Sequence, residues 1–208
     1  MPTSRVSLPS LIVHPDISTL SRRDWLELRR EGIGGSDAGT VLGVNPYSTL
    51  RDLYYDKIGC STANEEDGWV AKEYGHLLED LVARVFAKKT GFTVWQDNAM
   101  YAHPEYPFML ANLDRMTRDM TGVECGLECK TGNPNTRFRW DNNKVPFWYE
   151  VQVRHYMAVR NLDRFYIACL FGNNESEFVW RRIDRDLEFE ASLIEMEDYF
   201  WHENVQKH

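Results

Sequence analysis

The chain has 208 residues, of which 43% are hydrophobic and 13% aromatic, so its composition favours one sizeable folded domain over a disordered chain. No apolar run approaches the roughly 18–20 residues that a membrane helix needs, and the N-terminus does not have the pattern of a signal peptide, so we expect a cytoplasmic protein with reduced cysteines. The net charge of −8 argues against coating nucleic acid by bulk charge, but not against a DNA enzyme whose carboxylates bind cations.

The N-terminal third of the chain predicts short helices separated by turns. Three prolines in residues 1–20 predict an irregular segment. Ser21 and Asp24 predict a capped helix that Gly32 ends. The glycine turn at Ile33–Gly39 predicts the opening of a second helix. We expect a third helix over 49–58, a polar loop over 60–68, and a long helix over 70–90 that ends at Gly91.

The remainder of the chain predicts strands that alternate with helices. We expect strands over 92–96, 109–116 and 122–131, a polar loop over 132–146, a helix over 148–160, a hairpin of 165–171 with 177–183, and a final helix over 186–203. This order predicts an α/β fold with a central mixed β-sheet flanked by helices, in a single domain over 1–208.

Chemistry-bearing residues occur in the strand predicted over 122–131. Side chains alternate between the two faces of a strand, so Glu128 and Lys130 share one face and the apolar Leu127 and Cys129 share the other. Asp114 ends an apolar strand fourteen residues before Glu128. If the two strands pair as a hairpin, the two carboxylates converge, and together with a peptide carbonyl they would bind Mg²⁺. A lysine beside the metal would activate a water or stabilise charge on a phosphate.

An alternative interpretation is a surface strand with one salt bridge, because Glu-x-Lys and a terminal Asp are common. Three other features favour the metal site. Glu79 lies near the buried side of the long helix, where an unpaired carboxylate is costly. Gln152 lies on the helix that follows the strands. Gly34–Ser36 opens a helix, whose free N–H groups form an anion site, although a simple N-cap is the commoner reason for such a turn.

The cysteines and histidines indicate no separate metal centre. Cys125 and Cys129 lie four residues apart on one strand, ~13 Å at strand rise, and cannot share an ion. Cys60 and Cys169 show no paired spacing. The six histidines are scattered along the chain, so we expect roles in packing or DNA contact.

These motifs, taken in order, resemble one known family. They are Trp25–Arg29, Ile33–Ala38, Gly43–Tyr47, Gly75–Glu79, Leu113–Asp114, Leu127–Lys130 and Gln152–Met157. Each motif is weak alone, but their order is specific. The chain resembles the lambda exonuclease and YqaJ-like viral recombinase (alkaline exonuclease) family, which has the restriction-endonuclease-like nuclease fold, over roughly residues 22–185.

The resemblance implies a reaction and an assembly. It implies a Mg²⁺-dependent exonuclease, with two ions and with Mn²⁺ as a substitute, that digests one strand of linear double-stranded DNA from 5′ to 3′. The reaction would release 5′-mononucleotides and leave 3′ single-stranded tails for recombination. The resemblance also implies a ring-shaped homotrimer that binds DNA ends, and a single-strand annealing protein as its partner.

The resemblance also implies roles for individual residues. Those expected at the metals are Asp114, Glu128, the backbone carbonyl of Cys129, and Glu79, with Lys130 as the catalytic lysine and Gln152 lining the site. Those expected on the 5′-phosphate or the DNA are Arg29, Ser36 and Arg154. Leu113 departs from the pattern, because the fold expects Pro there. The roles of Asn112 and His155 stay open.

Two other functions remain as alternatives. One is a structure-specific endonuclease on the same fold, which would cut circular DNA. The other is a module that binds DNA ends without catalysis. Retention of Glu79, Asp114, Glu128 and Lys130 argues against loss of chemistry, because buried like charges repel each other and a scaffold alone has no need of them.

Overall fold

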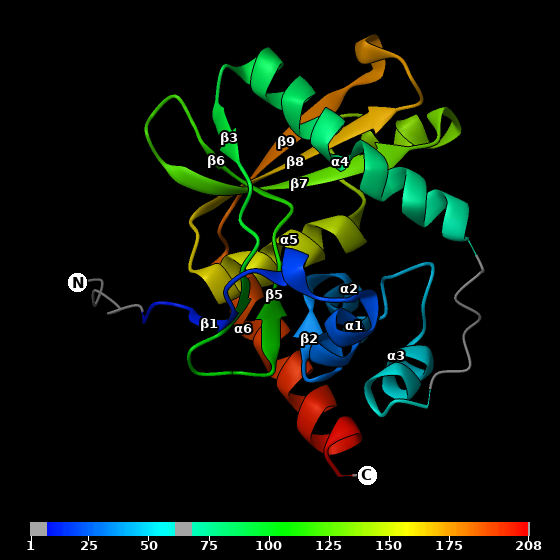
Figure 1. Cartoon of the computed structure of the whole chain (residues 1–208), viewed down its shortest axis with the longest axis vertical. Helices are drawn as coiled ribbons and strands as arrows, with labels where there is room; N and C mark the ends of the chain where they lie inside the picture. The colour runs from blue at the N-terminus through cyan, green and yellow to red at the C-terminus, as the bar shows by residue number, and fades with distance from the viewer. Residues whose placement is uncertain (1–7, 61–67, 208) are drawn as a thin grey trace.

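The computed structural model describes residues 8–60 and 68–207, which form two β-sheets and the helices around them (Figure 1). The strands are β1 (Leu11–His14), β2 (Ile33–Gly34), β3 (Thr93–Trp95), β4 (Met100–Ala102), β5 (Met109–Ala111), β6 (Arg115–Arg118), β7 (Glu124–Gly132), β8 (Arg164–Phe171) and β9 (Val179–Asp184). The helices are α1 (Arg22–Arg30), α2 (Gly35–Val41), α3 (Leu50–Lys57), α4 (Trp69–Thr90), α5 (Phe147–Arg160) and α6 (Leu187–Tyr199). Shorter helical turns are η1 (Ile17–Thr19), η2 (Pro134–Trp140), η3 (Glu175–Glu177) and η4 (Phe200–Val205).

The larger sheet has five strands in the order β3-β6-β7-β8-β9. It is mixed, because β7 and β8 are parallel while its other neighbouring strands are antiparallel. Helix α4 covers one face, where Val82 and Phe86 pack with Leu127. Helix α5 covers the other face, where Val153 and Met157 join the cluster that contains Ile167. The predicted α/β fold with a mixed sheet between helices is confirmed.

The smaller sheet has four strands in the order β1-β4-β5-β2, and the sequence did not predict it. Residues 1–20 were expected to be irregular, but β1 and η1 lie in that segment; its first seven residues lie outside the described part of the chain. Strand β2 was expected to be only a turn. Both strands are short, so neither shows the alternation that marks a strand in a sequence.

The strand predicted over 109–116 is wrong in one respect that matters for the site. The structure divides it into β5, in the four-stranded sheet, and β6, in the five-stranded sheet. Residues 112–114 form the crossing between the two sheets. Because buried apolar residues lie on both sides of the break, at Met109, Leu113 and Met116, the sequence pattern does not reveal it. Asp114 therefore lies where the chain passes from one sheet to the other.

Most helix boundaries agree with their sequence signals. Ser21 caps α1 by accepting a hydrogen bond from the Asp24 N–H. Thr49 caps α3 by accepting a hydrogen bond from the Asp52 N–H. Gly91 ends α4 with a φ of 73°, which favours glycine. The loop predicted over 132–146 contains η2, and the last helix continues as a π-helical turn. The predicted loop at 60–68 lies mostly outside the described residues.

The two sheets pack on a shared hydrophobic cluster. Ile33 and Met109 of the smaller sheet belong to the same cluster as Ile167 of the larger sheet. In Figure 1, α5 lies between the five-stranded sheet and α2. Within the described residues, no helix combines the length and apolar character needed to span a bilayer. The single domain remains a prediction.

Candidate active site

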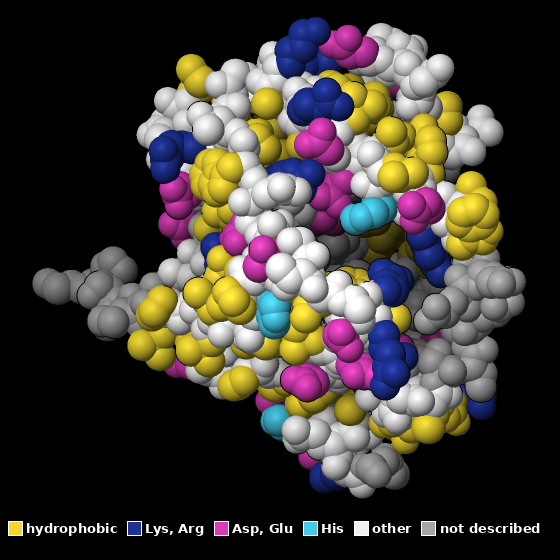
Figure 2. Space-filling view, in the orientation of Figure 1, with side chains coloured by type: hydrophobic (Ala, Val, Ile, Leu, Met, Phe, Trp, Pro, Cys, Tyr) yellow, Lys and Arg dark blue, Asp and Glu magenta, His cyan; other side chains and the backbone are white. Residues whose placement is uncertain are grey.

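A cavity of about 200 Å³ lies where the two sheets meet. Five of the predicted site residues line it: Arg29, Ser36, Asp114, Glu128 and Gln152. They come from α1, α2, the crossing before β6, β7 and α5. Figure 2 shows the surface hollowed between the upper part, built on the larger sheet, and the lower part that contains α1 to α3, with charged side chains around the hollow.

Asp114 and Glu128 converge in the way that the predicted hairpin requires. Strands β6 and β7 are antiparallel, and their last paired residues are Arg115 and Leu127. Asp114 immediately precedes β6, and Glu128 is the next residue of β7, so the two lie at the same end of the paired strands. The Asp114 carboxylate accepts a 2.8 Å hydrogen bond at Oδ2 from the Cys129 N–H. The sheet pairing therefore holds the two carboxylates beside each other.

Lys130 and Gln152 complete a hydrogen-bonded group around Glu128. The Lys130 ammonium donates to Glu128 Oε1 at 2.6 Å and to Gln152 Oε1 at 3.2 Å. The Gln152 amide donates to Glu128 Oε1 at 2.7 Å and to the Tyr156 hydroxyl at 3.2 Å. Glu128 and Gln152 are buried, whereas Lys130 is partly exposed. The network fixes the orientation of both the carboxylate and the ammonium.

Burial and charge repulsion make the two carboxyl groups weaker acids. Burial, and then the neighbouring Asp114, raises the pKa of Glu128 to about 7. Burial, and then Glu79, raises the pKa of Asp114 to about 6. Burial alone would lower the pKa of Lys130, but the two carboxylates outweigh it and raise that pKa. The pair would be stabilised by an added cation.

The donor atoms fit a divalent metal ion. Glu128 Oε2 is buried and has no hydrogen-bond partner among the described residues. The N–H and C=O of one residue in a strand point to the same edge, so the Cys129 carbonyl faces the same side as its N–H, toward Asp114. Two carboxylates and one carbonyl are hard oxygen ligands, the kind that Mg²⁺ takes.

Glu79 is not gathered with this pair as a third ligand. Its carboxylate forms an ion pair with the buried Arg115, and the same guanidinium lies 3.8 Å from Asp80. Over residues 8–60 and 68–207, the structure contains no cluster of three His, Cys, Asp or Glu side chains close enough to hold one ion. The sequence analysis did not single out Arg115, although a carboxylate near the core requires a partner.

Arg29 and Ser36 lie together, as the sequence analysis expected for residues on one phosphate. The Arg29 guanidinium donates to Ser36 Oγ at 2.9 Å and to Asp37 Oδ1 at 3.1 Å. Asp37 also accepts from the buried Lys57 at 2.7 Å. Burial would raise the pKa of Asp37, but Arg29 and Lys57 lower it to about 2. The sequence analysis missed Asp37 and Lys57, which hold Arg29 in place.

The remaining expected residues lie apart from this group or beside it. Arg154 lies outside the cavity lining, paired with Glu150 at 2.7 Å, so the structure does not bring it to the other site residues. His155 is fully buried, and its two ring nitrogens form hydrogen bonds with Glu197 and with the Leu110 carbonyl. Asn112 lines the cavity.

Comparisons with known proteins give the family and the fold of this chain. The model of the YqaJ-like viral recombinase domain matches residues 24–163. Over 190 residues the chain is 40% identical to the uncharacterized protein YqaJ of Bacillus subtilis. The match covers 90% of this chain and 58% of that protein. The chain thus spans less than two thirds of the length of that relative.

Solved structures show the same fold at low sequence identity. LHK-Exo in complex with dAMP has a TM-score of 0.73 and 17% identity, covering 89% of this chain and 93% of that one. LHK-Exo from Laribacter hongkongensis, an alkaline exonuclease, has a TM-score of 0.71 and 18% identity, with the same coverage of the two chains. A phage related exonuclease from Haemophilus somnus 129PT has a TM-score of 0.57 and 12% identity, and the match covers 88% of this chain and 100% of that one. The restriction-endonuclease-like fold expected from the sequence is confirmed.

Proposed function

We propose, from the premise that this chain belongs to the YqaJ-like viral recombinase domain family, that it is a metal-dependent deoxyribonuclease that digests linear duplex DNA from its 5′ ends. One observation carries the proposal. A single cavity is lined both by two carboxylates next to a lysine, one buried and one partly buried, and by an arginine–serine pair. The first group suits phosphodiester hydrolysis and the second suits a terminal phosphate. A protein with this fold is known with dAMP bound, a mononucleotide of the product class.

The proposed metal ligands are Asp114, Glu128 and the Cys129 carbonyl, with Mg²⁺ as the ion and Mn²⁺ as a substitute. When bound, the metal supplies Lewis acidity and neutralises charge on the phosphate. A second ion would require Glu79. Because Arg115 now holds the Glu79 carboxylate, that carboxylate must leave Arg115 to become a ligand.

Lys130 is proposed to act as a fixed cation and hydrogen-bond donor. Its raised pKa keeps it protonated at neutral pH, so it orients the attacking water and stabilises negative charge on the phosphate. Gln152 holds both Lys130 and Glu128 through its amide. This arrangement positions the ammonium before substrate arrives, which lowers the cost of orienting it during reaction.

Arg29 and Ser36 are proposed to bind the 5′-terminal phosphate. Arginine has five N–H donors, and the contacts with Ser36 and Asp37 both use one terminal nitrogen, Nη2. Asp37 is also bonded to Lys57, which offsets its charge near the phosphate. Because each cut creates a new 5′-phosphate, the pocket would favour rebinding after every step.

The larger assembly is also a proposal. Release of 5′-mononucleotides would leave a 3′ single-stranded tail, the substrate of a single-strand annealing protein in recombination. A homotrimeric ring around DNA is proposed from family membership. These properties are those of a whole protein, whereas this chain spans 58% of the length of its relative from Bacillus subtilis.

The test is digestion of matched linear and closed-circular duplex DNA with Mg²⁺, with and without a 5′-phosphate. The proposal expects loss of the 5′-ended strand from linear DNA only, and faster loss with a phosphate. Cutting of the circle would assign an endonuclease instead. Binding of linear DNA without cutting would assign a module that binds DNA ends.

A further inference from the structure

A group of aromatic and cationic side chains, three of them exposed and one partly buried, lies beside the proposed active site. Its members are Tyr47, which follows α2, Phe138 and Arg139 of η2, and Trp148 in the first turn of α5; we name them the ring surface. Tyr47 is 74% exposed and Phe138 is 65% exposed. Large rings dominate cores and interfaces, so two such rings in water mark a surface that a ligand can cover.

The ring surface is held together by contacts between its members. The Arg139 guanidinium lies 5.6 Å from the Trp148 ring centre and 5.9 Å from the Phe138 ring centre. Tyr47 packs edge-on against Trp148, with 6.2 Å between centroids. Arg139 is exposed and makes no ion pair with any residue that the structure describes. An uncompensated cation therefore lies between two rings.

This surface is continuous with the proposed catalytic lysine. Trp148 contacts Tyr149, with 5.4 Å between ring centroids, and the Lys130 ammonium lies 4.8 Å over the Tyr149 ring. Gln152, which bonds Lys130, follows one turn later on α5. Gln152 also lines the cavity that contains Arg29 and Ser36, together with Tyr156. A chain of contacts therefore leads from the cavity through Gln152, Lys130 and Tyr149 to the ring surface.

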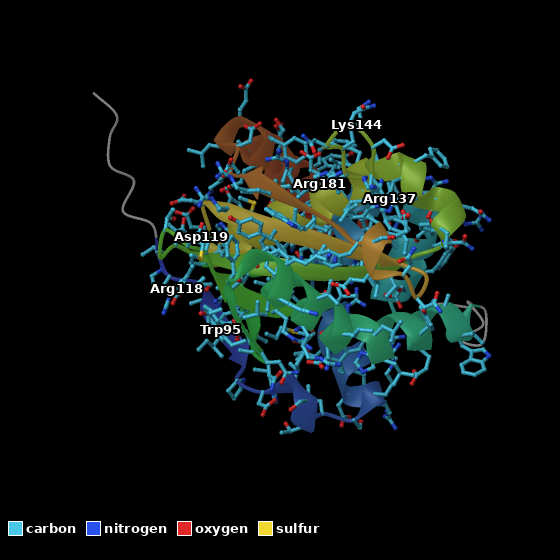
Figure 3. All side chains as sticks on the ribbon, turned by 90° about the horizontal axis from the view of Figure 1, so that it is seen from above. Trp95, Arg118, Asp119, Arg137, Lys144 and Arg181 are labelled. Carbon is cyan, nitrogen blue, oxygen red and sulfur yellow. The ribbon has the colours of Figure 1, made fainter. Side chains whose placement is uncertain are left out.

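Positive charge gathers at the same end of the molecule. Figure 3 shows Arg137, Lys144 and Arg181 near one another, and Trp95, Arg118 and Asp119 toward the opposite side. Arg137 is paired with Asp141 and Glu177, but Lys144 and Arg181 have no carboxylate partner in the described part of the chain. On the opposite side, Arg118 is paired with Glu124. In a chain of net charge −8, this end is suited to a polyanion.

We propose that the ring surface binds unpaired nucleotides of single-stranded DNA, by stacking bases on Tyr47 and Phe138 and by contact of a phosphate with Arg139. The inference rests on the proposed function, because digestion of one strand leaves its complement unpaired. Base faces are hidden in a duplex and accessible in a single strand, and stacking accepts every base because each has a π-face. An acidic peptide would satisfy Arg139 but would leave both exposed rings without a partner.

The test measures binding of a short oligothymidylate, and of a base-free strand with the same number of phosphates, by the Asp114→Asn protein. Phe138→Ala and Tyr47→Ala are each expected to weaken oligothymidylate binding about tenfold, the effect of losing one stacked base. Arg139→Ala is expected to weaken binding and to reduce the salt slope by about 0.7. Phe138→Trp should retain affinity, because it retains a ring. Tyr199→Ala, at another ring that is 66% exposed, is the matched control and should change nothing.

Two results would overturn the inference: equal affinity for the base-free strand, or unchanged affinity in both Phe138→Ala and Tyr47→Ala. Thermal unfolding of each variant shows that the fold is intact. Failure of the proposed function has a different signature, since it is the absence of duplex cleavage by the unmodified protein. A protein that cleaves linear DNA but binds the base-free strand equally well contradicts only the ring surface. A protein that prefers bases but cuts nothing contradicts only the nuclease.

Discussion

The Cys129 N–H donates a 2.8 Å hydrogen bond to the Asp114 carboxylate, and this bond joins the crossing between the two sheets to the strand that carries Glu128 and Lys130. Asp114 follows a strand of the smaller sheet and precedes a strand of the larger one. The bond therefore fixes the candidate metal ligands relative to the Arg29–Ser36 pair, which lies on the side of the smaller sheet. Any change that loosens this junction should disturb both halves of the site.

Removal of either partner in the proposed chemistry should abolish cleavage and leave DNA binding. Asp114→Asn keeps the shape and removes the charge that would hold the cation, and Lys130→Ala removes the fixed ammonium. We expect loss of at least about 10²-fold in turnover, the cost of one preorganised electrostatic group. Digestion of linear duplex DNA and a binding assay on the same variants measure the two effects.

The matched control for these variants is Glu124→Gln, a carboxylate on the same strand that is half exposed and paired with Arg118. It should leave turnover unchanged. Retained turnover in Asp114→Asn or Lys130→Ala would contradict the site assignment.

The metal-free protein should become less stable as pH rises through neutrality. Burial and mutual repulsion raise the folded-state pKa of Asp114 to about 6 and of Glu128 to about 7, above the unfolded values near 4. The folded state thus binds protons more tightly. The stability that these protons contribute is complete below about pH 4 and is lost as pH rises through about 6 and 7.

Thermal unfolding in a chelator, from about pH 5 to pH 8, checks this linkage. The unfolding temperature should fall with pH less steeply in Glu128→Gln than in the unmodified protein. Added Mg²⁺ should raise it most at the alkaline end, where both carboxylates are charged. An equal fall of the unfolding temperature with pH in the two proteins would contradict the raised pKa of Glu128.

Arg29→Ala should remove the preference for phosphorylated 5′ ends. A hydrogen bond to a charged group contributes about 1.5–3 kcal/mol, so we expect the ratio of rates on phosphorylated and unphosphorylated ends to fall by about tenfold or more. Parallel digestion of the two substrates measures this ratio. Arg23→Ala, on the same helix and 85% exposed, should keep the ratio of the unmodified protein. An unchanged ratio in Arg29→Ala would exclude its role at the phosphate.

Lys57→Met should destabilise the fold strongly. Lys57 is only 1% exposed and donates both to Asp37 at 2.7 Å and to the Arg29 carbonyl at 3.0 Å. The substitution leaves Asp37 paired with Arg29 alone among the described residues, so we expect a cost of about 3 kcal/mol, the lower end for breaking a buried ion pair. Chemical denaturation measures this loss.

The comparison variant for Lys57→Met is Asp56→Asn. It breaks the partly exposed pair of Asp56 with Arg30, 3.6 Å apart, and should cost less than about 1 kcal/mol. Equal losses in the two variants would show that the Asp37–Lys57 pair has no special role in the fold.

Much of the larger sheet was predictable from local pattern. Alternation along 122–131 placed Glu128 and Lys130 on one face and Leu127 on the other, and the structure buries Leu127 under α4 and joins Lys130 to α5. Helix α4 was predicted within one residue at its start, because its apolar spacing and Gly91 are local signals. The positions of Asp114 and Glu128 followed from one assumption, the hairpin pairing.

The smaller sheet and the supporting charges were not predictable. Strand β2 pairs with β5, more than seventy residues away along the chain, and a two-residue strand has no periodicity of its own. Arg115 and Lys57 are ordinary basic residues in the sequence. Only their burial beside Glu79 and Asp37 shows that they compensate the charges of these carboxylates.

The sequence by itself determined which residues could perform chemistry and on which face of a strand or helix each one lies, because side-chain direction follows from the period of a strand or a helix. The tertiary structure alone decided which of them meet. It brought Arg29 and Ser36 to the cavity of Asp114 and Glu128, engaged Glu79 with Arg115, and directed Arg154 to Glu150. Each outcome depends on how two sheets and α5 pack together. That packing is set by buried contacts between segments far apart in the chain, which no local pattern encodes.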